Sequence, residues 1–271
     1  MCPSVSFHPC TSALTTMQLI DTHAHLDQIE NIEEALRQAD QAGVETVLAV
    51  GVDQASNQKN LTLKTQLQRP KIYCALGIHP EFAHLDEAEK GIEFIKKNIS
   101  QATAIGEIGL DYWYKWVRKE EDVKERLRYI YRAQLEIAKE KNLPVTIHSR
   151  GAWQDCLDIA KDVGIKKAVF HWYSGPVDIL DAILKCGYFI SATPSLAYSP
   201  QAQEAIKHAP IEQTLIETDS PVYYKDNEGS GFQATPKDVF QTLKLYCGLK
   251  NLSEEKAAEA FNRNARELFN F

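Results

Sequence analysis

The chain has 271 residues, long enough for one large domain or two smaller ones, and its 44% hydrophobic and 25% charged residues are ordinary for a globular protein. Its net charge of −7 argues against a protein that coats nucleic acid by bulk electrostatics, because such proteins lean basic. A metal-dependent nuclease stays possible, because bound cations supply local positive charge. No apolar run approaches the ~20 residues of a membrane helix, so we expect a cytoplasmic protein without membrane contact.

The first sixteen residues differ from the rest of the chain. They lack the basic start and long apolar run of a secretory signal, and the arginines of a transit peptide. We therefore expect residues 1–16 to form a disordered extension and residues 17–271 to form a single domain. The six cysteines include no C-x-x-C pair, which predicts reduced thiols rather than a disulfide framework or a thiolate metal site.

Eight short apolar runs rich in β-branched residues follow one another along the chain, and we predict a strand at each. They are residues 19–23, 46–50, 72–77, 104–110, 145–148, 168–171, 188–191 and 214–217. Segments with apolar residues at helical spacing lie between several of them, at 32–42, 121–141, 152–163, 176–185 and 201–208. Gly43, Gly164 and Gly187 stand where helices should end, as glycines after a helix C-terminus do.

Strands alternating with helices over this length predict a (β/α)8 TIM barrel of one domain. A doubly wound open sheet is the alternative. The polar residues favour the barrel, because they follow the ends of several strands, whereas an open sheet gathers its site near one switch point. The last stretch, residues 253–269, predicts two short helices that cap the barrel, with Ser253 as an N-cap.

Six side chains of metal-binding type stand at the ends of these strands. His23 and His25 occupy alternate positions, which share one face of a strand, so both can reach one ion. The other four are Glu107, His148, His171 and Asp219. We expect all six to converge at one mouth of the barrel. Four imidazoles and two carboxylates suffice for two divalent cations, so the sequence predicts a metal-dependent hydrolase.

Six short motifs occur in a fixed order from residue 17 onward. They are D-x-H-x-H at 21–25, G-x-H-P at 77–80, G-E-x-G-L-D-Y at 106–112, H-x-R at 148–150, H-x-[FY]-S-G at 171–175 and E-T-D-S-P at 217–221. Each motif alone is weak. Together and in this order they resemble the TatD family of metal-dependent deoxyribonucleases, within the amidohydrolase-like superfamily.

The resemblance implies a TIM barrel, two divalent cations and hydrolysis of phosphodiester bonds in DNA, with exonuclease action on single-stranded ends. Transferred residue by residue, it makes His23, His25, Glu107 and Asp219 ligands of one metal ion. Glu107 would bridge to a second ion held by His148 and His171. His79 and Arg150 would contact the substrate phosphate. No obligatory protein partner is evident.

The chemistry of phosphodiester cleavage explains these residue types. A divalent ion lowers the pKa of bound water to about 7 in favourable sites, and two ions about 3.5–4 Å apart can hold the attacking and leaving oxygens. Glu107 would set that separation, and Asp219 can both ligate and accept the proton of the water. Arg150 offers a planar fork of donors for phosphate oxygens. Imidazole ligands suit zinc or manganese more than magnesium, so Mg, Mn and Zn all stay open.

Several neighbouring residues have two interpretations. We expect Asp21 to lie behind the ligands and Asp111 to hydrogen-bond the loop after the fourth strand. Glu217 can either orient a ligand or bind the metal itself, and both roles stay open. His79 could also serve only to shape the turn before Pro80.

Aromatic residues accompany two of the loops. In the segment 112–118 we favour base stacking for Trp113 and packing onto the barrel rim for Trp116. Tyr223 and Tyr224 present the same two possibilities on the last loop.

Two departures from the family pattern bear on the substrate. Trp172 stands where many members have cysteine, and residues 225–236 lack the arginine of the R-x-x-N-x-P element that many members carry. The alternative function is a metal-dependent amidohydrolase, lactonase or phosphotriesterase acting on a small substrate. Many such relatives carry a carboxylated lysine at the position of Glu107, which favours the nuclease. A third possibility, a non-catalytic metal-bound scaffold, is disfavoured by the complete ligand set.

Overall fold

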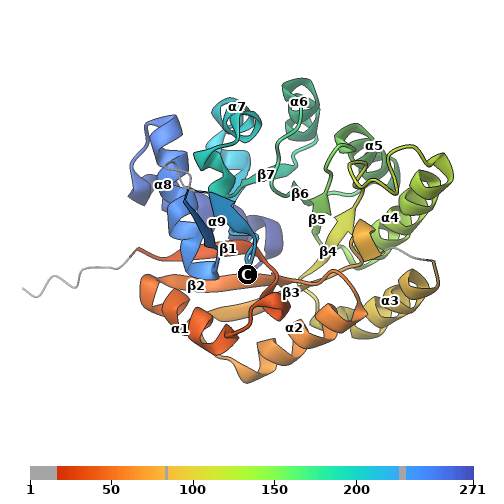
Figure 1. The fold of residues 1–271 in the computed structure, drawn as a ribbon, viewed down its shortest axis with the longest axis horizontal. Helices are drawn as coiled ribbons and strands as arrows, with labels where there is room; N and C mark the ends of the chain where they lie inside the picture. The colour runs from red at the N-terminus through yellow and green to blue at the C-terminus, as the bar shows by residue number, and fades with distance from the viewer. Residues whose placement is uncertain (1–16, 83–84, 226–229) are drawn as a thin grey trace, which may run out of the picture.

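The computed structural model describes residues 17–82, 85–225 and 230–271, and its strands form a nearly closed barrel (Figure 1). Eight parallel strands lie side by side in chain order: β1 (Leu19–Ala24), β2 (Val44–Val50), β3 (Lys71–Leu76), β4 (Ala104–Gly109), β5 (Val145–His148), β6 (Ala168–Phe170), β7 (Phe189–Ala192) and β8 (Thr214–Ile216). The backbone N–H of Asp219 donates to the His23 carbonyl (2.9 Å), which ties the end of β8 to β1. The predicted TIM barrel is confirmed, and each predicted strand lies within two residues of its observed bounds.

Helices surround the barrel (Figure 1). They are α1 (Ile32–Ala42), α2 (Gln54–Gln66), α3 (Leu85–Asn98), α4 (Glu121–Lys141), α5 (Trp153–Val163), α6 (Val177–Lys185), α7 (Pro200–His208) and α8 (Val239–Lys250). The five predicted helices are confirmed, and α2, α3 and α8 are additional. Helix α2 is polar and buries few apolar side chains, so its sequence shows no clear apolar stripe. Gly43 and Gly164 end α1 and α5 in the left-handed conformation, as predicted.

The C-terminal segment forms one helix, α9 (Glu254–Phe269), so the prediction of two short helices there is wrong. No Gly or Pro interrupts this stretch, and its helical hydrogen-bond pattern therefore continues. Ser253 accepts from the Lys256 backbone N–H (3.4 Å) as the predicted N-cap. Leu268 and Phe269 pack with residues at the starts of the strands, such as Ile20. Helix α9 thus closes the N-terminal end of the barrel.

A hairpin after the last barrel strand and the state of the cysteines are further features of the described residues. A short antiparallel hairpin, β9 (Tyr223–Lys225) and β10 (Gly231–Gln233), follows β8. The cysteines in the described part of the chain are free, as predicted: Cys74, Cys156, Cys186 and Cys247. Among the described residues, no helix is both long and apolar enough to span a bilayer. The predicted disordered extension, residues 1–16, lies outside the described residues.

Candidate metal centre and catalytic cleft

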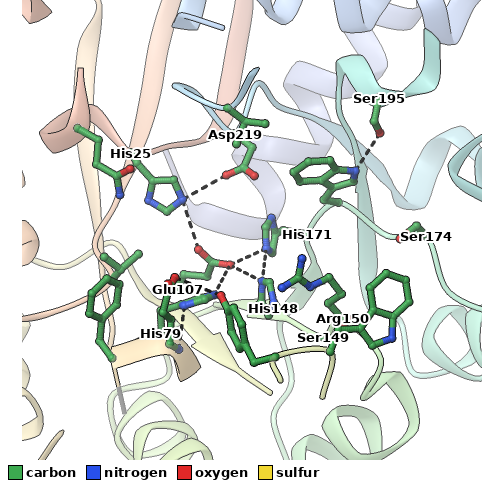
Figure 2. Close-up of a pocket in the computed structure, with 18 of the residues that line it drawn as sticks. His25, His79, Glu107, His148, Ser149, Arg150, His171, Ser174, Ser195 and Asp219 are labelled. Carbon is green, nitrogen blue, oxygen red and sulfur yellow. Dashed lines mark hydrogen bonds and ion pairs between the residues drawn. The ribbon is translucent and has the colours of Figure 1, made fainter. Parts of the chain in front are cut away.

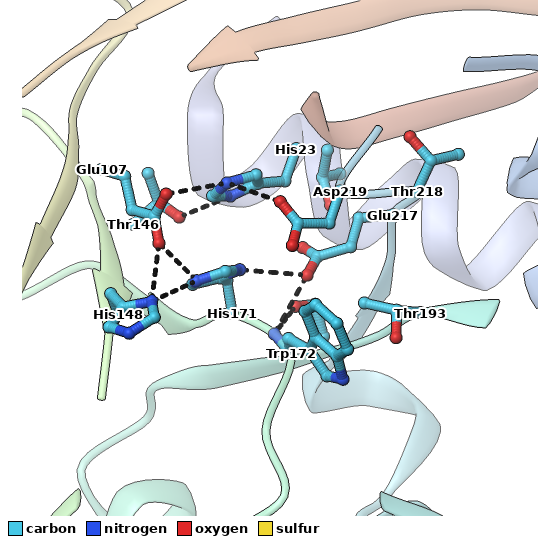
Figure 3. Close-up of polar contacts among 12 residues, drawn as sticks. His23, Glu107, Thr146, His148, His171, Trp172, Thr193, Glu217, Thr218 and Asp219 are labelled. Atoms are coloured by element: carbon cyan, nitrogen blue, oxygen red, sulfur yellow. Dashed lines mark hydrogen bonds and ion pairs between the residues drawn. The ribbon is translucent and has the colours of Figure 1, made fainter. Parts of the chain in front are cut away.

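The six predicted metal ligands meet at the C-terminal mouth of the barrel (Figures 2 and 3). They come from the ends of five different strands, which is why residues 23 and 219 become neighbours. Glu107 lies at the centre of the cluster, with His23 on one side and His148 and His171 on the other (Figure 3). The side chains that sequence reasoning selected are therefore brought together.

The first group of donors contains both histidines of β1 and its extension. Glu107 Oε2 lies 3.4 Å from His23 Nε2 and 3.5 Å from His25 Nε2. Asp219 Oδ1 lies 3.5 and 3.2 Å from the same two nitrogens. Four ligand atoms placed tetrahedrally at zinc-like bond lengths would lie roughly 3.4 Å apart. The donors therefore have the spacing that one divalent cation requires.

Two of these donor atoms have no other partner. His23 Nε2 and Asp219 Oδ1 are buried, and neither has a hydrogen bond within the described residues. Buried polar atoms without partners are costly, and in native proteins they call for a bound water or ion. The residues present therefore fit a cation at this position.

The second group of donors uses the other oxygen of Glu107. Oε1 lies 2.6 Å from His171 Nε2 and 2.9 Å from His148 Nδ1, and the two nitrogens are 3.3 Å apart. The two shorter separations are those of hydrogen bonds, so a second cation would take the place of the protons shared in these contacts. Glu107 would then belong to both groups of donors.

Hydrogen bonds behind the cluster orient three of the imidazoles. Nδ1 of His25 faces the Val50 carbonyl (3.1 Å), and Nδ1 of His171 faces Glu217 Oε1 (3.3 Å). Nε2 of His148 faces a carboxylate, Asp111 Oδ2 (2.8 Å). Carbonyl and carboxylate oxygens only accept, so the outer ring nitrogens donate, and the inner nitrogens offer a lone pair to a cation once they give up their own protons. Of the two roles left open for Glu217, this contact supports the orienting one.

Asp21 lies behind the ligands, as expected. Its carboxylate accepts from the backbone N–H and hydroxyl of Thr218 (3.0 and 2.6 Å), and from the His23 N–H (3.3 Å). Burial raises its pKa well above the ordinary value, although the hydrogen bonds from Thr218 oppose this. Asp21 therefore fixes the backbone beside two ligands.

Charge balance in the cluster depends on the carboxylates. Burial would lower the pKa of His25, but the adjacent carboxylate of Asp219 and the charge of Glu107 raise it to about 9. Burial opposes ionisation of Glu107, yet the surrounding imidazoles hold its pKa well below the ordinary value. Without a bound cation, the imidazoles of the cluster therefore retain a proton at the position that the cation would occupy.

Two residues in the cluster have left-handed backbones. Asp219 has φ 49° and Trp172, which follows His171, has φ 43°. This conformation costs a non-glycine residue roughly 1–2 kcal/mol, and such residues gather at functional sites. The strain lies where the candidate ligands are presented.

His79 lies beside the cluster and directs a ring N–H toward it. The Glu81 backbone N–H donates to His79 Nδ1 (3.1 Å), so the ring proton lies on Nε2, which is 3.7 Å from Glu107 Oε1. Burial lowers the pKa of His79 to about 3, which keeps the ring neutral at pH 7. In this state Nε2 offers a hydrogen rather than a lone pair, which suits a substrate oxygen better than a metal ion.

Two buried amides that sequence reasoning missed hold the loop before His79. Asn57 donates to the Gly77 carbonyl (2.8 Å) and accepts from the Gly77 N–H (3.1 Å). Gln134 makes the same pair of contacts with Ile78 (3.1 and 2.7 Å). The position of Gln134 on the apolar stripe of the predicted helix 121–141 was the available signal.

Arg150 stands at the edge of the cluster (Figure 2). Its Nε donates to Asp111 Oδ2 (2.7 Å), and its guanidinium lies 5.1 Å from the ring centre of Tyr114. Asp111 also accepts from the Trp113 backbone N–H (2.8 Å), which confirms its predicted bond to the loop after the fourth strand. Its links to Arg150 and His148 were not predicted.

A cleft of about 1250 Å³ opens above the cluster (Figure 2). Outside the candidate ligands, its described lining includes two cations, Lys59 and Arg150, and four carboxylates: Asp27, Asp53, Glu81 and Glu204. The rim is therefore acidic, and positive charge in the cleft depends on Lys59, Arg150 and bound cations. Such a surface favours local recognition of a phosphate over binding along a long polyanion.

The aromatic residues of these loops differ in exposure. Trp113 lines the cleft and is 54% exposed, whereas Trp116 is 40% exposed and stacks on Tyr114 with ring centres 5.8 Å apart. The contact of Trp116 is with the loop itself, in line with its predicted packing role. Tyr224 is buried and Tyr223 is 64% exposed.

The fold and the site together define the class of this protein, a metal-dependent hydrolase built on a TIM barrel. The sequence profile of the family described as "TatD related DNase" matches residues 20–270. The chain therefore belongs to the TatD-related DNase family.

Three similar proteins agree with this assignment. An uncharacterized metal-dependent hydrolase of Haemophilus influenzae is 32% identical over 256 residues, which cover 93% of this chain and 99% of that protein. The human deoxyribonuclease TATDN3 is 27% identical over 263 residues, covering 93% of this chain and 94% of the relative. The crystal structure of the TatD homologue YjjV from Escherichia coli superimposes with a TM-score of 0.83 at 27% identity, covering 94% of this chain and 99% of that one.

Proposed function

We propose that this hydrolase cleaves phosphodiester bonds of DNA as an exonuclease acting on single-stranded ends, at a centre of two divalent cations. The proposal rests on the observation that the two oxygens of Glu107 face different groups of histidines. One of its oxygens faces His23 and His25, and the other faces His148 and His171. A single bridging carboxylate between two groups of imidazoles is the arrangement that a two-metal hydrolase needs.

The first cation would be held by His23, His25, Glu107 and Asp219, and the second by Glu107, His148 and His171, as their mutual distances support. Cations in these positions would polarise the phosphoryl group and make water nucleophilic near neutral pH. We leave their identity open among magnesium, manganese and zinc, because imidazole donors favour the latter two.

Side chains of the protein would accept the proton and bind the phosphate. Asp219, buried at the floor of the cleft, would accept the proton of the attacking water. Arg150 keeps its two terminal amino groups free of Asp111, which binds only Nε, so both can donate to phosphate oxygens. His79 Nε2–H would donate to a third oxygen. These donors stabilise charge that grows during the reaction.

DNA as the substrate is supported by the family and by the human relative that is named a deoxyribonuclease. The acidic rim of the cleft favours a second candidate, hydrolysis of a small phosphodiester, phosphotriester or lactone. A small substrate would need only Arg150 and the cations, without a basic track for a polymer.

A substrate screen separates the two candidates. Protein reconstituted with manganese, zinc or magnesium should be tested against single-stranded DNA, double-stranded DNA, bis(p-nitrophenyl) phosphate and a simple lactone. The proposal expects the highest kcat/KM on single-stranded DNA, with mononucleotides released from the start of the reaction. Preferred turnover of the lactone, or no cleavage of DNA with any metal, would reject it.

A further inference from the structure

We infer that Trp113 and Trp153, on the cleft wall next to Arg150, form a nucleobase-binding subsite. The inference deepens the proposed function and rests on it for the choice of ligand. It extends the base stacking that the sequence favours for Trp113 to a subsite of two tryptophans beside the phosphate-binding Arg150.

The two indoles meet at nearly a right angle and together form an aromatic wall of the cleft. Their ring centres lie 6.3 Å apart at an angle of 85°, and Trp153 lies 6.5 Å from the ring of Tyr173. Both tryptophans line the cleft, and Trp113 is 54% exposed. An exposed indole backed edge-on by a second indole presents a fixed flat face, and concave aromatic surfaces of this kind are typical of ligand sites.

Two glycines make room for this wall. Gly151 has φ +72°, and a Cβ on it would lie 2.3 Å from Trp113 Cδ1. A Cβ on Gly175 would lie 2.8 Å from Trp153 Cγ. The loops after β5 and β6 therefore carry glycine where a side chain would displace an indole. Glycine at these two positions leaves space for the indoles, which supports a specific arrangement of the two rings.

The position of Arg150 identifies the occupant. Its guanidinium lies 5.8 Å from the ring centre of Trp113, and Asp111 anchors it at the edge of the metal cluster. A ligand that fills both places carries an anionic phosphate and, a short distance away, a flat ring. A nucleotide has this form. Stacking tolerates every base, because each has a π face, and it supplies affinity that the acidic rim does not.

Binding of two sugar phosphates, one with a base and one with a hydroxyl in its place, tests the inference without turnover. Thymidine 5′-monophosphate and 2-deoxyribose 5-phosphate should be titrated calorimetrically into the manganese-loaded protein. Stacking on one aromatic face corresponds to about five- to hundredfold in affinity. We therefore expect the nucleotide to bind at least about fivefold more tightly. Equal affinity for the two ligands, or binding of neither, would overturn the inference.

Substitutions assign the difference to the wall. Trp113→Ala should bring the nucleotide close to the affinity of the sugar phosphate and leave the latter unchanged, whereas Trp113→Phe should keep most of the preference. Tyr129→Ala, at an aromatic that is 64% exposed on α4 and outside the cleft lining, should have no effect. An undiminished preference in a folded Trp113→Ala protein would overturn the assignment.

A matched pair of glycines provides an independent test. Gly151→Ala and Gly187→Ala place alanine in nearly the same left-handed backbone, at φ +72° and +75°. Only the first would push an indole, because a Cβ on Gly187 meets nothing within 4 Å. We expect Gly151→Ala alone to reduce the preference for the nucleotide. Equal preference in both variants would contradict a wall held in place by Gly151.

Failure of the subsite can be told apart from failure of the proposed function. If the enzyme cleaves phosphodiesters but binds the two ligands equally, only the subsite is wrong. If the nucleotide is preferred through Trp113 but no phosphodiester is cleaved, the subsite stands and the proposed reaction falls.

Discussion

Asp111 and Arg150 are joined by one ion pair, with 2.7 Å between Oδ2 and Nε. Asp111 is buried, while the Arg150 side chain is 44% exposed and reaches into the cleft. Burial opposes ionisation of Asp111, but hydrogen bonds from His148 and the Trp113 N–H, together with the charge of Arg150, keep its pKa below the ordinary value. A buried carboxylate thus aims an arginine at the place where substrate should bind.

The first prediction concerns this arginine. Arg150→Ala should raise KM for phosphodiesters about 10- to 100-fold, as expected for loss of charge-assisted hydrogen bonds, with metal content unchanged. Arg150→Lys should recover only part, because an ammonium lacks the planar fork. Steady-state kinetics and metal analysis measure both effects. Arg132→Ala, at an exposed pair with Asp162, is the control. A loss of bound metal as large as the rise in KM would reassign Arg150 to the metal shell.

Glu107 should be required for both cations. Glu107→Ala removes the only carboxylate shared by the two donor groups, so we expect loss of most bound metal and hydrolysis below detection, with the far-UV circular dichroism of the barrel retained. Elemental analysis after dialysis measures the metal. Glu136→Ala, on the exposed side of α4, should behave as the wild type. Unchanged turnover in the Glu107 variant would remove this residue from the mechanism.

Because the ring proton of His79 lies on Nε2, replacement of this residue by glutamine or by asparagine should have different effects. Glutamine can place an N–H near the position of Nε2, whereas asparagine reaches only the position of Nδ1. His79→Gln should therefore retain more kcat/KM than His79→Asn, and both should keep the metal content of the wild type. If either variant loses one equivalent of metal, His79 is a ligand rather than a donor to substrate.

Metal affinity should rise with pH. Metal-free His25 has a pKa of about 9, raised above the ordinary value against the effect of burial by Asp219 and Glu107. A cation at Nε2 must displace this proton. Burial opposes protonation of His171, but Glu107 and Glu217 raise its pKa well above the ordinary value as well. Protons on these rings compete with the metal, so affinity should increase at least about tenfold per pH unit from 7 to 9. Calorimetry in two buffers of different ionisation enthalpy should record release of one or more protons at pH 7. An affinity independent of pH would contradict the proton count.

The stability of the barrel should depend on its closing helix. Phe269 is 2% exposed and packs among residues of the inner strands. Phe269→Ala should lower the free energy of unfolding by about 3–5 kcal/mol. The melting temperature should fall by about 2–4 °C per kcal/mol, as for chains of similar size. Tyr129→Ala, at an exposed aromatic, should change stability little. A melting temperature unaffected by the Phe269 change would show that α9 is dispensable for the barrel.

Sequence patterns predicted the strands and the six converging side chains for a physical reason. Parallel strands buried on both faces read as continuous apolar runs, and a polar residue at the end of such a run is conspicuous. Glu107, His148 and Asp219 each stand out in this way. Helix α2 lacked a comparable signal, because its buried face includes the amides of Asn57 and Asn60.

The sequence could not predict which side chains contact one another. That Asp111 contacts both His148 and Arg150, or that Gly151 faces Trp113, depends on how loops from different strands meet. The merging of the predicted C-terminal pair into α9 also reflects packing, since the helix is held along its length by the barrel end. Local patterns identify the donors, and tertiary structure decides which donor faces which partner.

Because side chains fill the barrel and α9 covers its N-terminal end, nothing passes along the axis. Whatever enters the mouth must leave by the mouth. Under the proposed function, departing products therefore compete with incoming strands for the same passage, and inhibition by released nucleotide should be competitive.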